Sequence, residues 1–290
     1  MTVPVLAFLN GRFLPATDTA LSLADAGFVS GATVVDNART YGGRPFRWAD
    51  HLARFRRDCE RCYVPLKLDD AELTRIAGEL LAHNLPSSPP GELHVVTVAT
   101  PGPPDGPPTL AMSTRPVRVE RYRPFFKSGV ALAVAGTQSF DPNDLLPPTV
   151  KHRSRLHWHI AEQTIRVQFP GAVPVVMNRG ASDTAIGGIA AVSTDGALLL
   201  PRPEFVQESI SLKVLRELGG PSRVEAFSWW SDDVRELLLA GTGFGVAGVK
   251  VLHDGDRSRT FDWPGPVYRR LLAAWSRLAG VDIERQFLDH

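Results

Sequence analysis

The sequence has few cysteines, no long apolar run and no excess of charge. Only Cys59 and Cys62 are cysteines, which excludes a disulfide scaffold and is typical of a reducing compartment. No stretch approaches the roughly 18 apolar residues of a membrane span, and no basic segment precedes the short apolar N-terminal stretch. Lys and Arg number 32 against 31 Asp and Glu, so no field attracts nucleic acid or an anionic membrane. We expect a cytoplasmic protein that binds neither.

Two short motifs that would suggest other functions lack the neighbouring sequence that those functions require. Gly243 to Gly248 spells Gly-x-Gly-x-x-Gly, but a dinucleotide site needs a strand before it and a helix after it, whereas Val249 to Leu252 looks like a strand. The Cys59-x-x-Cys62 pair has no second pair to complete a four-ligand zinc site. It also lies inside an expected helix and not at a helix start. We therefore expect no metal and two reduced thiols.

What the chain does contain fits a globular protein of two domains. Its 290 residues are 43% hydrophobic, enough to build a sizeable core. We predict an α+β fold with a smaller domain over residues 1–115, an interdomain crossing over 116–127 and a larger domain over 128–290. The 24 prolines gather in loops, notably 86–90 and 101–108 and the loop before Lys151.

Local signals predict the individual elements. Asn10-Gly11 and Gly42-Gly43 each separate two short strand-like runs and predict hairpins. We expect helices starting at Asp50 and over residues 69–84, 152–167, 209–218 and 267–278, the first with Asp50 as its N-cap. Strands are expected over residues 32–41, 93–99, 109–113, 130–135, 173–177, 189–192 and 197–200. The second domain would carry Lys151 at the start of a helical run.

A lysine in such a place is usually a solvated charge, but its neighbours form a recognisable pattern. Residues 151–156 read Lys-His-Arg-Ser-Arg-Leu, and residues 51–55 read His-Leu-Ala-Arg-Phe. Together with Leu9-Asn10-Gly11 and the block from Asp25 to Phe46, they resemble the class IV aminotransferases, the fold-type IV pyridoxal-phosphate enzymes. That family includes branched-chain and D-amino-acid aminotransferases and 4-amino-4-deoxychorismate lyase. The resemblance runs from Leu9 to about Pro266.

The resemblance implies roles for particular residues. Lys151 would hold pyridoxal 5'-phosphate as an imine and act as general base and acid. Arg54 would bind the cofactor phosphate, and so would two segments rich in backbone N–H groups. These segments are Ile210 and Ser211 at a helix start, and Gly241 and Thr242 in a turn.

Other positions depart from the family pattern. The family places a glutamate against the pyridine nitrogen, and the corresponding segment here is Ser182-Asp183-Thr184. Asp183 aligns with the glutamate if the alignment includes a one-residue shift in the preceding turn, and Thr184 aligns with it if there is no shift. Arg39 would meet a substrate carboxylate. Leu156 stands where branched-chain enzymes have a tyrosine.

Three functions follow as alternatives. The first is an aminotransferase moving an amino group between an amino acid and a 2-oxo acid, acting as a homodimer with the cofactor at the domain interface. The second is a 4-amino-4-deoxychorismate lyase-like enzyme that releases pyruvate and 4-aminobenzoate, as the Lys-His-x-x-Arg-Leu spelling suggests. The third is a non-catalytic member that serves as a binding module.

Overall fold

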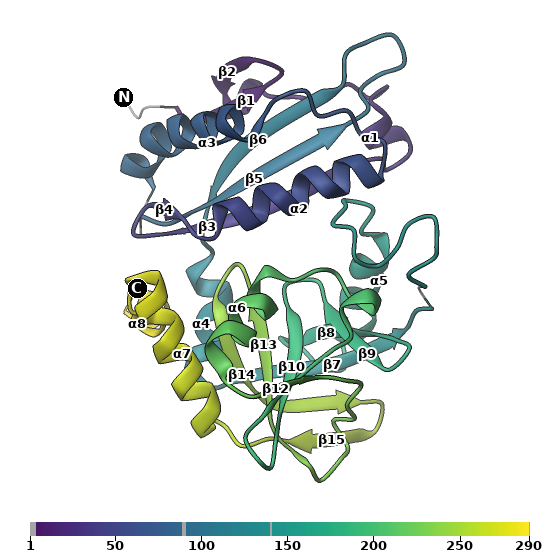
Figure 1. The fold of residues 1–290 in the computed structure, drawn as a ribbon, viewed down its shortest axis with the longest axis vertical. Helices are drawn as coiled ribbons and strands as arrows, with labels where there is room; N and C mark the ends of the chain where they lie inside the picture. Colours follow the sequence, from purple (N-terminus) through teal and green to yellow (C-terminus); the bar gives the residue numbers. More distant parts are fainter. Residues whose placement is uncertain (1–3, 89–90, 140, 290) are drawn as a thin grey trace. The chain divides into compact units, whose positions relative to one another are not determined.

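The chain folds into two compact units (Figure 1). The computed structural model describes residues 4–88, 91–139 and 141–289. The first unit comprises residues 1–117 together with 150–154, and the second comprises 118–149 together with 155–290. The segment that holds Lys151 therefore belongs to the first unit, although the sequence prediction assigned it to the larger domain. Part of the proline-rich stretch 86–90 lies outside the described residues.

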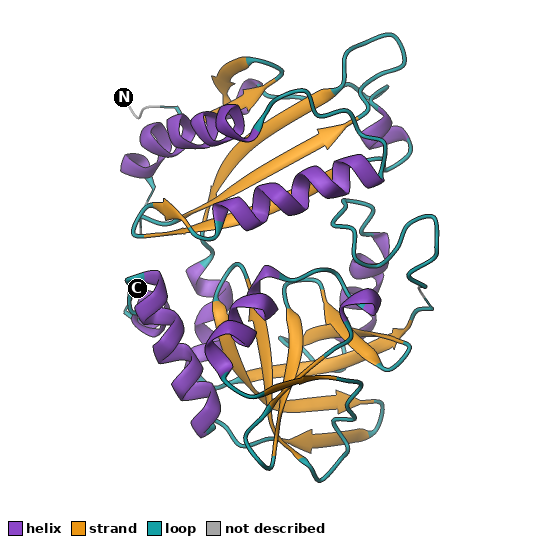
Figure 2. Ribbon diagram, in the orientation of Figure 1, coloured by secondary structure: helices purple, strands orange, loops and turns teal. Residues whose placement is uncertain are grey.

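In its described part, the first unit is built on a six-stranded antiparallel sheet (Figure 2). The strands follow the order β2 (Arg12–Pro15), β1 (Leu6–Leu9), β6 (Thr109–Pro116), β5 (Leu93–Thr100), β3 (Val34–Tyr41), β4 (Arg44–Pro45). Both predicted hairpins form, between β1 and β2 and between β3 and β4. Their turns need positive φ angles, which Asn10 (46°) and Gly11 (88°) adopt in the first of them.

Two helices cover one face of this sheet. They are α2 (Trp48–Arg61) and α3 (Asp70–Asn84). Side chains alternate across the sheet, so Val34, paired with Ala99, and Ala38, paired with Val95, point to the same face. Val34 and Ala99 pack with Phe55 of α2, and Val95 packs with the α3 leucines. The same alternation turns Asp36 of β3 toward the helices.

The helix starts show how the two helices are capped. Helix α3 begins after Asp69, whose side chain accepts from the Glu72 N–H at 2.8 Å, and the Glu72 side chain accepts from the Asp69 N–H at 3.1 Å, a capping box. The predicted start of α2 at Asp50 is wrong. The helix begins two residues earlier, after Arg47 with φ of 54°, and Asp50 lies in its first turn, 3.7 Å from the Arg47 guanidinium.

The described part of the second unit contains a nine-stranded sheet. The order is β12 (Ser222–Val224), β11 (Leu198–Leu200), β10 (Gly188–Ser193), β13 (Val234–Gly241), β14 (Gly245–Asp254), β7 (Val130–Thr137), β8 (Val173–Asn178), β9 (Ala181–Thr184), with β15 (Arg257–Thr260) beside β14. Because β9 pairs with β8 and also with β10, the sheet closes on itself as a barrel from β10 round to β9. Fully buried side chains such as Leu132, Ile189 and Leu238 lie along its strands.

The helices of the second unit are α4 (Val119–Lys127), α5 (Leu156–Arg166), α6 (Ile210–Gly219), α7 (Pro266–Ala279) and α8 (Ile283–Leu288). A short 3-10 turn lies at Pro203–Phe205 in this unit. The first unit contains two further 3-10 turns, at Ala16–Asp18 and Leu85–Ser87, and the short helix α1 (Ala26–Val29).

α4 lies within residues 116–127, which were predicted to be an interdomain crossing. Its buried residues Val119, Tyr122 and Phe126 recur at helical spacing, a pattern that the charged residues between them obscured.

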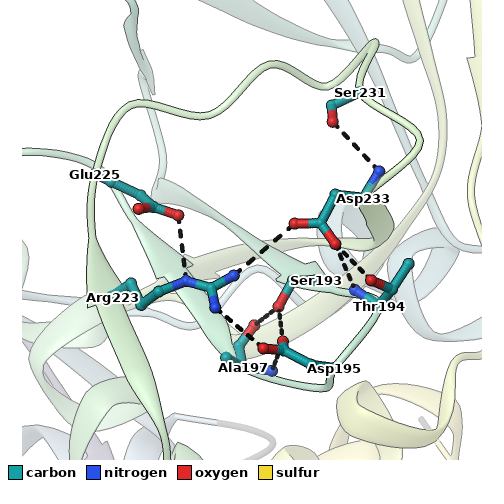
Figure 3. Close-up of polar contacts among 8 residues, drawn as sticks. All are labelled: Ser193, Thr194, Asp195, Ala197, Arg223, Glu225, Ser231 and Asp233. Atoms are coloured by element: carbon teal, nitrogen blue, oxygen red, sulfur yellow. Dashed lines mark hydrogen bonds and ion pairs between the residues drawn. The ribbon is translucent and has the colours of Figure 1, made fainter.

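A polar network fixes one edge of the second unit (Figure 3). The Arg223 guanidinium contacts Asp195 at 3.0 Å, Glu225 at 3.3 Å and Asp233 at 3.8 Å. Asp233 in turn accepts from the Thr194 hydroxyl at 2.5 Å. The network joins the turn after β10 to strand β12 and to the segment before β13. Its members are exposed, so each pair adds little stability on its own.

Candidate active site

Helix α2 presents polar side chains on its inner face. His51, Arg54 and Asp58 follow one another at intervals of three and four residues, so they share the same side of the helix. All three are buried, with exposed fractions of 3%, 4% and 2%. Charged groups are rarely buried to this extent unless they have partners. Their position therefore marks this face as a candidate site.

Asp36 of β3 joins two of these side chains. Its Oδ1 lies 2.6 Å from His51 Nδ1, and its Oδ2 accepts from Arg54 Nε at 2.8 Å. Arg54 Nη2 also donates to Asp36 Oδ1 at 3.0 Å, so the pair is bidentate. Burial by itself would raise the pKa of Asp36, but the charges of Arg54 and His51 hold it well below the ordinary value. Burial lowers the pKa of His51, against the opposing effect of Asp36.

Lys151 is held against the same elements. Its backbone N–H donates to Asp58 Oδ2 at 2.9 Å, and its carbonyl accepts from the Val35 N–H at 3.1 Å. Residues 151–154 thus extend along β3 and do not start the predicted helix, which begins only at Leu156. Burial raises the pKa of Asp58, although the bonds from Lys151 and Arg57 oppose this shift. In the first unit, the backbone of Lys151 is therefore bonded to the helix that carries Arg54.

The acidic candidate, Asp183, lies on β9 in the second unit and is half-buried. Its Oδ1 accepts from the Thr184 N–H at 2.8 Å, and its Oδ2 accepts from the Gln207 N–H at 3.2 Å. Thr184 uses its hydroxyl differently: it donates to the Gly187 carbonyl at 2.5 Å and accepts from the Gly187 N–H at 2.9 Å. Thr184 thus fixes the turn before β10.

The two expected phosphate segments lie near that same turn. Ile210 and Ser211 are the first residues of α6, where N–H groups have no partner inside the helix. The Ser209 hydroxyl caps the helix by accepting from the Leu212 N–H at 3.2 Å. A Cβ on Gly188 would lie 2.6 Å from the Leu212 side chain, and one on Gly241 would press on the Ile186 carbonyl. The second unit therefore gathers the Asp183 turn, the start of α6 and the end of β13.

Arg155 also contacts this part of the second unit. Its Nη2 donates to the Ala185 carbonyl at 2.6 Å. Burial lowers the pKa of Arg155, and the neighbouring Asp183 carboxylate opposes the shift. The sequence analysis used Arg155 only as part of the Lys-His-x-x-Arg-Leu motif and gave it no role, and it did not single out Asp58.

Arg39 is separated from the Asp36 cluster by the sheet itself. It is three residues after Asp36 on β3 and therefore points to the other face. Its guanidinium carbon lies 4.0 Å above the centre of the Tyr41 ring, and its Nε donates to the Thr40 carbonyl at 3.1 Å. Arg39 is 2% exposed. It is thus part of a packed cluster within the first unit.

The remaining motifs behave as structural elements. The glycine-rich run 243–248 leads into strand β14 and not into a helix, which confirms that it is no dinucleotide fingerprint. Within the described residues, no cluster of three or more His, Cys, Asp or Glu could hold a metal ion. No helix within the described ranges combines the length and hydropathy needed to cross a bilayer.

Comparison with known families places these residues in context. A family model described as amino-transferase class IV matches residues 33–252. The chain belongs to this family. The matched range includes Arg54, Lys151, Asp183, Ser211 and Gly241, and it confirms the resemblance that their motifs suggested.

Class IV relatives reproduce the fold over almost the whole chain. A branched-chain amino acid aminotransferase of Escherichia coli aligns with a TM-score of 0.82 at 19% identity, covering 95% of both chains. A PLP-bound hypothetical aminotransferase from Mycobacterium tuberculosis aligns with a TM-score of 0.76 at 18% identity, covering 93% of this chain and 98% of that one. These likenesses confirm the two-unit fold-type IV architecture.

Sequence similarity to characterised class IV enzymes is local. D-alanine aminotransferase from Staphylococcus epidermidis is 32% identical over 77 residues, which is 27% of either chain. The match therefore spans about a quarter of that relative. Class IV aminotransferases use pyridoxal phosphate. The first unit contains a lysine amine and a buried arginine, and the second contains helix N-terminal N–H groups and a carboxylate; each of these groups suits a part of that cofactor.

Proposed function

We propose that the chain is a pyridoxal-phosphate-dependent aminotransferase that moves an amino group between an amino acid and a 2-oxo acid. The observation that carries this proposal is the joint placement of Lys151 and Arg54. Lys151 is bonded through its backbone to Asp58, and Arg54 lies one helical turn before Asp58 on the same face of α2. An amine and a guanidinium held by one rigid helix suit a cofactor that carries both an aldehyde and a phosphate.

Each group has a distinct task in this proposal. When bound, pyridoxal phosphate supplies an electron sink for negative charge that develops at the substrate Cα. Lys151 would hold the cofactor through its Nζ and, once displaced by the substrate, take the proton from Cα. Arg54 would bind the phosphate, together with the N–H groups of Ile210 and Ser211 and the turn at Gly241 and Thr242.

Asp183 is our choice for the partner of the pyridine nitrogen. The hydroxyl of Thr184 is already used by its own turn, where it contacts Gly187 as donor and acceptor. The Asp183 carboxylate accepts a backbone N–H on each oxygen, and an ionised carboxylate is an acceptor that suits a ring N–H. A carboxylate also stabilises a protonated ring nitrogen, which a hydroxyl does not do comparably.

The proposal is tested by cofactor attachment. Wild type and Lys151→Ala are incubated with pyridoxal phosphate, their visible absorbance is recorded, and the mixtures are treated with borohydride before peptide mass spectrometry. We expect a visible band and a stable adduct on Lys151 in the wild type, and neither in the variant. Amino-group transfer from D- and L-amino acids to 2-oxoglutarate or pyruvate then identifies the donor. A colourless wild type without an adduct would refute the proposal.

The lyase alternative has one observation in its favour. The segment Lys151-His152-x-x-Arg155-Leu156 is spelled as in the 4-amino-4-deoxychorismate lyases. A lyase needs no 2-oxo acid acceptor, so incubation with aminodeoxychorismate alone distinguishes the two reactions. Release of pyruvate and 4-aminobenzoate would replace the aminotransferase proposal, whereas acceptor-dependent turnover would support it. A protein that binds the cofactor with neither activity would be a binding module.

We also propose a homodimer. The first unit exposes apolar side chains close together in the sequence, with Leu23 at 76%, Phe28 at 67% and Val29 at 68% exposure. Association of two copies would be favourable if it removed such side chains from water. Light scattering after size exclusion should give twice the chain mass of 31.6 kDa, and a mass of one chain would contradict the proposal.

A further inference from the structure

We propose that Thr184 is a positioning residue: its hydroxyl closes the turn 184–187 and thereby holds Asp183 at a fixed separation from the phosphate turn, which is Gly241 and Thr242. This inference rests on the proposed function, in which Asp183 meets the pyridine nitrogen and the phosphate turn meets the phosphate of the same cofactor. It gives Thr184 a role that needs no contact with the cofactor.

The Thr184 hydroxyl ties its turn together. It donates to the Gly187 carbonyl at 2.5 Å and accepts from the Gly187 N–H at 2.9 Å. It also accepts from the Ile186 N–H at 3.2 Å. These bonds use the one donor and the two acceptor lone pairs of a hydroxyl. Thr184 is 5% exposed, so loss of the hydroxyl would leave buried backbone groups without their partner.

The other end of this turn packs against the strand that leads to the phosphate turn. A Cβ on Gly187 would lie 2.5 Å from the Ala240 carbonyl oxygen and 3.2 Å from the Gly241 Cα. In the same way, a Cβ on Gly241 would press on the Ile186 carbonyl. The two backbones are therefore in contact with no side chain between them. Close-packed backbone atoms of this kind leave little room for a relative shift.

These contacts form one continuous path within the second unit. Asp183 precedes Thr184 in the chain, the Thr184 hydroxyl fixes Gly187, and Gly187 packs against Gly241. Pyridoxal phosphate carries its ring nitrogen and its phosphate on one aromatic ring, so a site for it must hold both partners at a suitable separation. Groups that are fixed before binding lose less conformational freedom when the ligand arrives. Loss of the Thr184 hydroxyl should therefore weaken the contacts to both ends of the cofactor together.

A purely structural role of Thr184 predicts a different result. If the hydroxyl only stabilised the fold, its loss would weaken the binding of every ligand by the same factor. If it only supported the neighbouring Asp183, its loss would weaken the contact to the ring nitrogen and leave the phosphate contact unchanged. Ligands that lack one group or the other therefore separate these roles.

The test compares three ligands on the purified protein. Dissociation constants of pyridoxal phosphate, of pyridoxal, which lacks the phosphate, and of 1-deazapyridoxal phosphate, which lacks the ring nitrogen, are measured by equilibrium dialysis. The preference for pyridoxal phosphate over each analogue reports one end of the cofactor. In Thr184→Val, which keeps the shape but not the hydroxyl, both preferences should fall at least about fivefold, as for a lost buried hydrogen bond. Thr184→Ser keeps the hydroxyl and should restore most of both.

Thr164→Val serves as the matched control. The Thr164 hydroxyl donates to the Ile160 carbonyl at 2.9 Å on an exposed part of α5, so both preferences should stay at the wild-type values. Unchanged preferences in Thr184→Val, a fall in only one of them, or a failure of Thr184→Ser to restore them would overturn the inference.

A second perturbation leaves the hydroxyl in place. Gly187→Ala would push the turn away from the Ala240 carbonyl, and both preferences should fall again. If Thr184→Val does not fold, Gly187→Ala decides, and wild-type preferences there overturn the inference. If the wild type binds none of the three ligands, the proposed function fails before the role of Thr184 is reached.

Discussion

Replacement of Asp58 should loosen the segment that carries Lys151. In the wild type the Lys151 N–H donates to Asp58 Oδ2 at 2.9 Å, and Asp58 is only 2% exposed. Asp58→Ala therefore removes the acceptor of this N–H at a buried position. A buried donor left without a partner costs about 1–3 kcal/mol. Taking about 2 kcal/mol, opening of residues 150–154 should become about thirtyfold more frequent, since 1.4 kcal/mol is about tenfold.

Asp58→Asn should behave differently from Asp58→Ala. The amide oxygen can still accept from the Lys151 N–H. Burial raises the pKa of Asp58, which means that the buried carboxylate is itself disfavoured, and a neutral amide avoids that cost. We therefore expect opening to increase less than about fivefold, or under about 1 kcal/mol.

The assay is hydrogen exchange of the peptide that contains residues 150–154, read by mass spectrometry, with the α3 peptide as internal reference. Exchange should rise strongly in Asp58→Ala, slightly in Asp58→Asn, and not at all in α3. Equal exchange in the two variants would refute the reasoning, because it would show that the charge and not the acceptor holds Lys151. Unchanged exchange in Asp58→Ala would show that the other bonds to β3 suffice.

Iodoacetamide near neutral pH should leave Cys59 of the native protein unmodified, because Cys59 is 1% exposed and burial raises its pKa to about 12. Cys62, whose pKa is also raised by burial, should be modified slowly. Equal modification of the two cysteines in peptide mass spectra would contradict this. Gly241→Ala should lower the melting temperature by the equivalent of about 1–3 kcal/mol, because the new Cβ presses on the Ile186 carbonyl; an unchanged melting curve would count against the packing described. His51→Gln should flatten the loss of stability below the ordinary histidine pKa of 6.5. Burial lowers the pKa of His51 in the folded protein, so below pH 6.5 the unfolded chain binds more protons at this residue than the folded chain. The free energy of unfolding of the wild type should therefore fall, as the pH falls, by up to about 1.4 kcal/mol per pH unit from this residue. If the free energies of unfolding of wild type and variant, measured in urea, depend on pH with the same slope, the prediction is wrong.

Much of the local structure follows from short-range signals in the sequence. Asn10-Gly11 and Gly42-Gly43 predicted the hairpins because their turns require positive φ angles. The helix predicted over residues 69–84 forms as α3, whose buried residues recur at helical spacing. The starts of α2 and α5 could not be predicted, since Arg47 adopts a left-handed conformation and residues 151–154 are drawn into pairing with β3.

The sequence by itself determined the family, the two-part α+β organisation and the identity of Lys151 and Arg54 as candidates, because these follow from the order of residues along one chain. Only the tertiary structure decided what surrounds them. Asp36, His51 and Asp58 gain their roles from contacts between β3, α2 and the segment at Lys151. Lys151 bonds Asp58, which is 93 residues away in sequence, and Val35 of β3, which is farther away still. Burial and charge pairing arise only when such segments meet, so no local pattern reports them.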